Sequence, residues 1–145
     1  MENNIVLKEM KDLEITTGST KMGIFTTIDP SDIKTLYNLD NGECDFRLND
    51  CKGQAIRVQN VLIKNFDKYI DEDGKELDKP INKKVTILID DQNKTYVTAS
   101  KMFAIQMLRF IERFGNGAFE NGLDIKIIER EIRGSKNKGL GFELV

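Results

Sequence analysis

The sequence predicts a mainly β protein, a five-stranded Greek-key barrel with one helix between its third and fourth strands. Five runs rich in β-branched and aromatic residues follow residue 53, and a capped apolar helix separates the third run from the fourth. The chain has 145 residues, which is the size of one domain. With 39% hydrophobic and 32% charged residues, it can bury a core of its own.

The part of the chain before the barrel is predicted to be only partly regular. Residues 1–20 show no clean hydrophobic period, and we interpret them as an N-terminal arm. A single domain is expected over residues 21–145. It begins with a short strand at 21–28 and a short helix, for which Asp29–Pro30 supplies the N-cap and first helical position. The barrel core then occupies about residues 52–145.

The first three barrel strands are predicted from alternation and turn signals. Residues 54–66 alternate apolar and polar side chains, but the alternation slips at Asn60, which indicates a β-bulge. A polar connection is expected over residues 67–82, with an Asp-Gly pair at its tip. Residues 85–89 and 95–98 are the second and third strands, joined by a short turn.

The rest of the chain completes the predicted order. Ser100 is expected to cap a helix over residues 101–114, which Gly115 ends. Residues 124–133 and 139–145 predict the last two strands, with a lysine-rich turn between them. Three strands, a helix and two strands is the order of the OB-fold, which binds oligonucleotides or oligosaccharides through its second and third strands and two loops.

Composition excludes several classes of enzyme. The chain has no histidine, which removes Ser-His-Asp and Cys-His catalysis and the usual zinc hydrolase sites. Neither a Walker A motif nor a dinucleotide glycine pattern is present. Cys44 and Cys51 cannot hold zinc alone, and we expect reduced thiols. The expectation is a protein that is not an enzyme, with no cofactor and no metal.

A metal-dependent nuclease is the catalytic alternative. Its ligands would come from five carboxylates on predicted strands and turns: Asp90, Asp91, Asp124, Glu129 and Glu131. Two aspartates before a turn are, however, ordinary turn chemistry. Glu129 and Glu131 alternate with Arg130, as the solvated face of a strand does.

Charge and hydropathy bear on location and partners. The longest strongly apolar stretch, residues 102–111, is broken by two polar residues and is too short to span a membrane. The N-terminus lacks the pattern of a signal peptide, so we expect a cytoplasmic protein without a membrane partner. The net charge is −2, but acidic residues gather in residues 40–50 and 71–78, which leaves room for one basic face.

Several pieces of the chain, in order, resemble the single-stranded DNA-binding proteins of Gram-positive phages and conjugative plasmids: Ile89-Asp90-Asp91, Thr95-Tyr96-Val97-Thr98, Ser100-Lys101 and Phe114-Gly115. The closing strands with their lysine-rich turn, and Lys52-Gly53-Gln54-Ala55-Ile56, are similar too. The resemblance covers residues 50–145, and residues 15–50 loosely. It implies an OB-fold that protects single strands during replication or transfer. The chain departs from the pattern in lacking a glycine at Gln92-Asn93-Lys94.

A sequence-neutral single-strand binder needs aromatic faces for the bases and cations for the phosphates. Tyr96 faces the binding groove if Val97 shares the core with Ile87 and Ile89; the alternative is a packed ring with its hydroxyl paired. Two further stacking candidates, Phe66 and Tyr69, stand where the connection between the first two strands is expected to begin. The candidate phosphate contacts are Arg57, Lys64, Lys84, Arg133, Lys136 and Lys138.

The expected partner is therefore single-stranded DNA. The N-terminal arm, residues 1–15, is a candidate for self-association that would make binding cooperative. Two alternatives stay open at this level. First, an OB-fold can bind protein or oligosaccharide instead, and the acidic net charge favours this alternative. Second, basic loops can bind duplex DNA as well as single strands.

Overall fold

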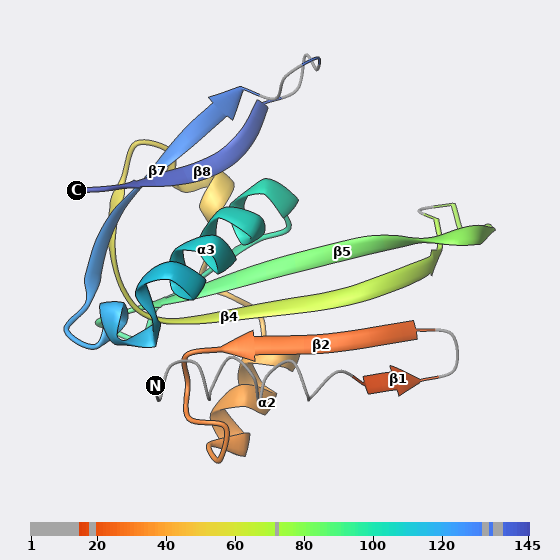
Figure 1. The fold of residues 1–145 in the computed structure, drawn as a ribbon, viewed down its shortest axis with the longest axis horizontal. Helices are drawn as coiled ribbons and strands as arrows, with labels where there is room; N and C mark the ends of the chain where they lie inside the picture. Colours follow the sequence, from red (N-terminus) through yellow and green to blue (C-terminus); the bar gives the residue numbers. More distant parts are fainter. Residues whose placement is uncertain (1–14, 18–19, 72, 132–133, 135–137) are drawn as a thin grey trace.

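The computed structural model describes residues 15–17, 20–71, 73–131, 134 and 138–145 (Figure 1). The fold is mainly β. Its strands are β1 (Ile15–Thr17), β2 (Thr20–Thr26), β3 (Phe46–Arg47), β4 (Ala55–Ile70), β5 (Glu76–Asp90), β6 (Thr95–Thr98), β7 (Leu123–Glu131) and β8 (Lys138–Leu144). Its helices are α2 (Ile33–Asn41) and α3 (Lys101–Phe114), with 3-10 turns η1 (Leu48–Cys51) and η2 (Asn116–Phe119).

All these strands belong to one curled sheet. The order β1-β2-β4-β5-β6-β3 runs along the sheet, and β7 pairs with the first residues of β4 and then with β8. Every pairing is antiparallel except that of β3 with β6. The sheet curves into an open half-barrel, with α3 between the β7–β8 hairpin and the β4–β5 hairpin (Figure 1).

The half-barrel stays open because β6 and β8 do not pair within the described residues. The free edge of β6 is taken by the short strand β3, through Phe46 and Arg47. The free edge of β8 is met by a side chain of α3 instead of by a strand. Gln106 donates its Nε2 to the carbonyl of Phe142 at 2.6 Å, and its Oε1 accepts from the N–H of Phe142 at 3.1 Å. The mainly β prediction is thus confirmed, and the described strands form a half-barrel that is consistent with a barrel-like fold. The five-stranded Greek-key barrel stays a prediction.

Two groups of buried side chains lie on opposite faces of the sheet. The larger one holds the buried side of α3, including Phe103 and Met107, against β4, β5, β7 and β8. The smaller one, with Leu62 and Ile87, lies on the face toward α2. Since both faces are covered, Val61, Leu62 and Ile63 are all buried, which explains an apolar run without alternation.

The predicted bulge is present, one residue earlier than expected. Val58 pairs with Asp90 and Asn60 with Ile89, so Gln59 is the extra residue. The predicted helix 101–114 is confirmed at both ends: Ser100 Oγ accepts from the N–H of Phe103, and Gly115 follows with a φ of 80°.

Two expectations for the local structure are wrong. The connection predicted over residues 67–82 is mostly strand, because β4 continues to Ile70 and β5 begins at Glu76. This part of the β4–β5 hairpin, residues 67–82, projects beyond the rest of the sheet (Figure 1). We call it the arm, which is distinct from the N-terminal arm of residues 1–20. Its polar side chains pair with one another, as Asn82 does with Asn65 and Asp67. The cap of α2 is Asp32 instead of Asp29, which accepts from the N–H of Ser31.

Candidate nucleic-acid interface

A hollow of about 620 Å³ opens where β6 meets α3, bordered by η1 on one side and by the start of β8 on the other. Four cations line it, and each comes from a different segment: Arg47, Lys52, Lys101 and Lys138. No carboxylate is among the described residues that line it. We call this hollow the basic groove.

Local hydrogen bonds fix the backbone of the basic groove. The hydroxyl of Thr98 accepts from the N–H of Ser100 at 3.1 Å, which turns the chain from β6 into α3. The first turn of α3 therefore lies at the groove, and Ser100, Lys101 and Met102 line it. Because the N-terminus of a helix carries partial positive charge, it adds to the attraction of an anion here.

A second hollow, of about 650 Å³, lies along the arm, and we call it the arm hollow. Its apolar and aromatic lining includes Phe66, Tyr69 and Ile70. Its cations are Lys68, Lys83 and Lys84, with Asp67 as the acidic neighbour. Ala99 lines both the arm hollow and the basic groove, so the two adjoin at the end of β6.

Lys84 stands near this junction. Its Nζ donates to the Oδ1 atoms of Asn65 and Asn82, both at 2.7 Å. Burial lowers the pKa of Lys84, and the nearby charge of Lys101 lowers it further, against the opposite pull of Asp67. An anion bound between the two lysines would relieve their repulsion.

The structure brings together four of the residues predicted from the sequence. Phe66, Tyr69 and Lys84 line the arm hollow, and Lys138 lines the basic groove. Sequence reasoning missed the other cations of the two hollows: Arg47, Lys52, Lys101, Lys68 and Lys83. Lys101 had a usable signal, because the residue after a helix cap lies at the helix N-terminus.

Other predicted cations lie elsewhere and are paired. Arg57 holds Asp124 through two hydrogen bonds of 2.9 and 3.0 Å. Lys64 pairs with Asp40 at 3.2 Å, on the side of the sheet toward α2. The two remaining phosphate candidates, Arg133 and Lys136, fall outside the described residues.

Tyr96 adopts the packed arrangement that was the alternative for it. Val97 does pack with Ile87 and Ile89, but the ring of Tyr96 stacks on Phe46, with centroids 5.1 Å apart and planes at 28°. The Tyr96 hydroxyl donates to Asp90 at 2.8 Å. Burial and the Asp90 carboxylate raise the pKa of Tyr96 to about 12. A role for Tyr96 in base stacking stays a prediction.

Three of the five carboxylates considered for a metal, Asp90, Asp124 and Glu129, have other partners. Asp90 accepts from the N–H groups of Gln92 and Lys94 as well as from Tyr96, which is the turn chemistry expected of it. In the described part of the chain, no three His, Cys, Asp or Glu side chains come together as a metal site would require. The two cysteines are free, as predicted, and burial raises the pKa of both thiols.

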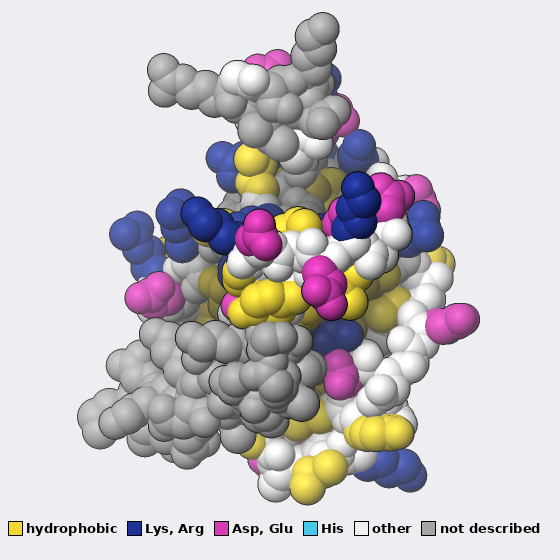
Figure 2. Space-filling model, turned by 90° about the vertical axis from the view of Figure 1, so that its right-hand side faces the viewer, with side chains coloured by type: hydrophobic (Ala, Val, Ile, Leu, Met, Phe, Trp, Pro, Cys, Tyr) yellow, Lys and Arg dark blue, Asp and Glu magenta, His cyan; other side chains and the backbone are white. Residues whose placement is uncertain are grey.

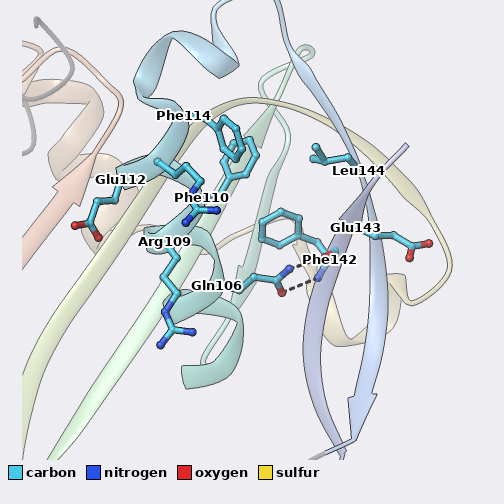
Figure 3. Close-up of a pocket in the computed structure, with 9 residues that line it drawn as sticks. Gln106, Arg109, Phe110, Glu112, Phe114, Phe142, Glu143 and Leu144 are labelled. Atoms are coloured by element: carbon cyan, nitrogen blue, oxygen red, sulfur yellow. Dashed lines mark hydrogen bonds between the residues drawn. The ribbon is translucent and has the colours of Figure 1, made fainter.

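A third hollow, of about 710 Å³, lies between the C-terminal half of α3 and β8, and we call it the α3–β8 hollow (Figure 3). Phe110 and Phe114 form one wall, with ring centroids 4.9 Å apart, and Leu144 lies opposite. The two hydrogen bonds between Gln106 and Phe142, which we call the Gln106 clamp, join α3 to β8 at one end of this hollow (Figure 3). Its charged lining is balanced, with two arginines and two glutamates: Arg109, Arg113, Glu112 and Glu143.

In the view onto the free end of the arm, the described residues do not form a continuous basic face (Figure 2). Lys and Arg side chains surround a hydrophobic centre, and Asp and Glu side chains stand among them (Figure 2). Positive and negative side chains are therefore interspersed on the part of this face that the structure describes. None of the helices in the described part of the chain has the length and apolar character needed to cross a bilayer.

Comparison with known proteins identifies no matching family model, no similar curated protein and no similar solved structure. The family suggested by the sequence therefore stays a prediction.

Proposed function

We propose that the protein binds single-stranded DNA without sequence preference, along the basic groove and the adjoining arm hollow. The observation that carries the proposal is the convergence of Arg47, Lys52, Lys101 and Lys138 on one groove whose described lining holds no carboxylate. Side chains that come from separate segments of the chain form such a set only through the fold. A groove of this kind attracts a polyanion and orders its backbone.

The basic groove would bind the phosphates of the strand, and the arm hollow would bind its bases. The cations of the basic groove neutralise phosphates, and the released counterions make binding salt-dependent. Phe66 and Tyr69 supply faces for stacking, which contributes about 1–3 kcal/mol per base and tolerates any sequence. Bases in a duplex are already stacked on their neighbours, so the arm hollow favours a single strand.

The strand arrangement supports an OB-fold interpretation as part of this proposal. Strands β4, β5, β6, β7 and β8, with α3 after the third of them, follow the predicted order. The gap between β6 and β8 would make this a partly open barrel, which the fold allows. A role in phage or plasmid replication or conjugative transfer rests on the sequence resemblance alone. The proposed self-association arm lies outside the described residues, apart from Ile15.

Fluorescence anisotropy with a labelled oligo-dT tests this function. We expect binding whose logarithmic affinity falls with the logarithm of salt concentration at a slope of about −2. This slope corresponds to the four cations, less the one carboxylate that pairs with two of them, at about 0.7 for each effective charge. Unlabelled duplex should compete poorly. Absence of binding at low salt would overturn the proposal and leave a protein- or oligosaccharide-binding module as the function to test.

A further inference from the structure

One carboxylate stands at the margin of the basic groove and contacts two of its four cations. Glu129, on β7, accepts from Lys52 Nζ at 3.0 Å through Oε1. Its other oxygen, Oε2, lies 3.6 Å from Lys138 Nζ. The two lysines come from distant parts of the chain, one after η1 and the other at the start of β8, and Glu129 bridges them.

This bridge is open to solvent and easily replaced. The side chain of Glu129 is 41% exposed, and those of Lys52 and Lys138 are 45% and 55% exposed. Ion pairs this exposed contribute little to stability, because solvent screens them. The hydrogen bond from Lys52, with the charge of both lysines, holds the pKa of Glu129 below its ordinary value, so the carboxylate stays ionised.

A carboxylate that bridges two ammonium groups resembles a phosphate in the same place. Each presents two oxygens and a negative charge to the cations, and both are satisfied by charge-assisted hydrogen bonds. We propose that Glu129 is an internal competitor of the DNA phosphate, which a bound strand must displace from Lys52 and Lys138. This inference rests on the proposed single-strand binding and adds a regulating residue to that site.

The competition has two measurable consequences. Replacing Glu129 by Gln removes the opposing charge and frees both lysines, so affinity for DNA rises by about 2- to 5-fold. The salt slope becomes steeper by about 0.7, because one more effective charge acts on the phosphates. A carboxylate with a merely structural role would produce the opposite pattern, a loss of thermal stability without a gain in affinity.

The test compares the wild-type protein with Glu129→Gln and with a matched control, Glu143→Gln, by oligo-dT anisotropy at several salt concentrations. Glu143 lies on the neighbouring strand β8 and lines the α3–β8 hollow, so the control makes the same change of net charge outside the groove. We expect tighter binding and a steeper slope for Glu129→Gln alone. Thermal unfolding of all three proteins checks that the fold is retained.

The possible failures are distinguishable. If the wild type binds, and Glu129→Gln binds no tighter than Glu143→Gln, the competitor role of Glu129 is overturned while the proposed function stands. If neither the wild type nor Glu129→Gln binds oligo-dT at low salt, both proposals are overturned. Binding by Glu129→Gln alone would also overturn the function proposed for the wild-type protein, and with it the inference that rests on that function.

Discussion

The basic groove and the α3–β8 hollow flank the same helix and the same strand and are similar in size, about 620 and 710 Å³. They differ in charge and in their position along α3. The groove lies at the N-terminal turn of α3 and has four cations without a carboxylate among its described lining residues. The α3–β8 hollow lies along the C-terminal half of α3, and two arginines and two glutamates are among its lining residues.

This difference teaches that size alone does not distinguish the proposed binding site from the α3–β8 hollow. The partial charges of a helix favour anions at its N-terminus and disfavour them at its C-terminus. In the groove, the side-chain cations and the helix dipole act in the same direction. In the α3–β8 hollow, the helix dipole disfavours an anion, and the negative charges of the two glutamates balance the positive charges of the two arginines. The predictions below test this contrast, beginning with the largest expected effect.

Charge reversal should separate the two regions most strongly. The variant Arg47→Glu with Lys101→Glu should weaken oligo-dT binding on the order of 100-fold at moderate salt, because two phosphate contacts become repulsive. The matched variant Arg109→Glu with Arg113→Glu makes the same change of charge in the α3–β8 hollow. It should alter affinity only slightly. Equal losses in both variants, measured by anisotropy, would contradict the contrast.

Aromatic substitution should give the next largest effect. Tyr69→Leu should weaken binding by about 1–3 kcal/mol, because a stacked base loses its partner. The control is Phe114→Leu, since Phe114 is 61% exposed and lines the hollow. Tyrosine fluorescence reports on the same contact without a label, because the chain has three tyrosines and no tryptophan. If Tyr69→Leu binds oligo-dT as tightly as the wild type and shows the same degree of tyrosine quenching, Tyr69 does not belong to the site.

Gln106→Leu should affect stability more than binding. The substitution leaves the N–H and carbonyl groups of Phe142 without their partner, which costs about 1–3 kcal/mol for each buried group that stays unsatisfied. Urea unfolding measures the loss, and oligo-dT affinity should change little because Gln106 lies outside the groove. An unchanged unfolding midpoint would show that water or another group replaces the clamp.

The smallest effect is a pH dependence set by Lys84. Its lowered pKa means that the folded protein disfavours the charged form. Between that pKa and the ordinary lysine value of 10.5, the unfolded chain binds more protons, so stability rises with pH. Affinity for DNA should fall over the same interval as Lys84 loses its charge. Lys84→Met should flatten both trends, and parallel titrations of unfolding and binding check this.

Local signals explain which parts of the fold the sequence could predict. The bounds of α3 follow from a side-chain cap at Ser100 and a glycine at residue 115, both of which act within a few residues. The sequence predicts a loop over the arm because this segment is rich in charged residues and contains Asp73-Gly74 and Pro80. Pro80 is accommodated at the register shift opposite Lys68 and Ile70, where ladder pairing is interrupted.

The candidate site could be predicted only in part. Phe66 and Tyr69 were found because they lie near a predicted loop, although that loop proved to be a strand. Arg47 was missed because it reaches the groove through a parallel pairing of β3 with β6, which joins segments about fifty residues apart. No periodicity in the sequence encodes such a pairing. The convergence of cations from separate segments is a property of the tertiary structure.

Amide chemical-shift mapping during an oligo-dT titration tests the central claim most directly. We expect the largest shifts at residues 98–102 and 138–140 of the basic groove and at residues 66–70 and 83–85 of the arm hollow. Residues 106–114 and 142–144 around the α3–β8 hollow should move little. Shifts concentrated in that hollow, with the groove unchanged, would contradict the assignment of the site.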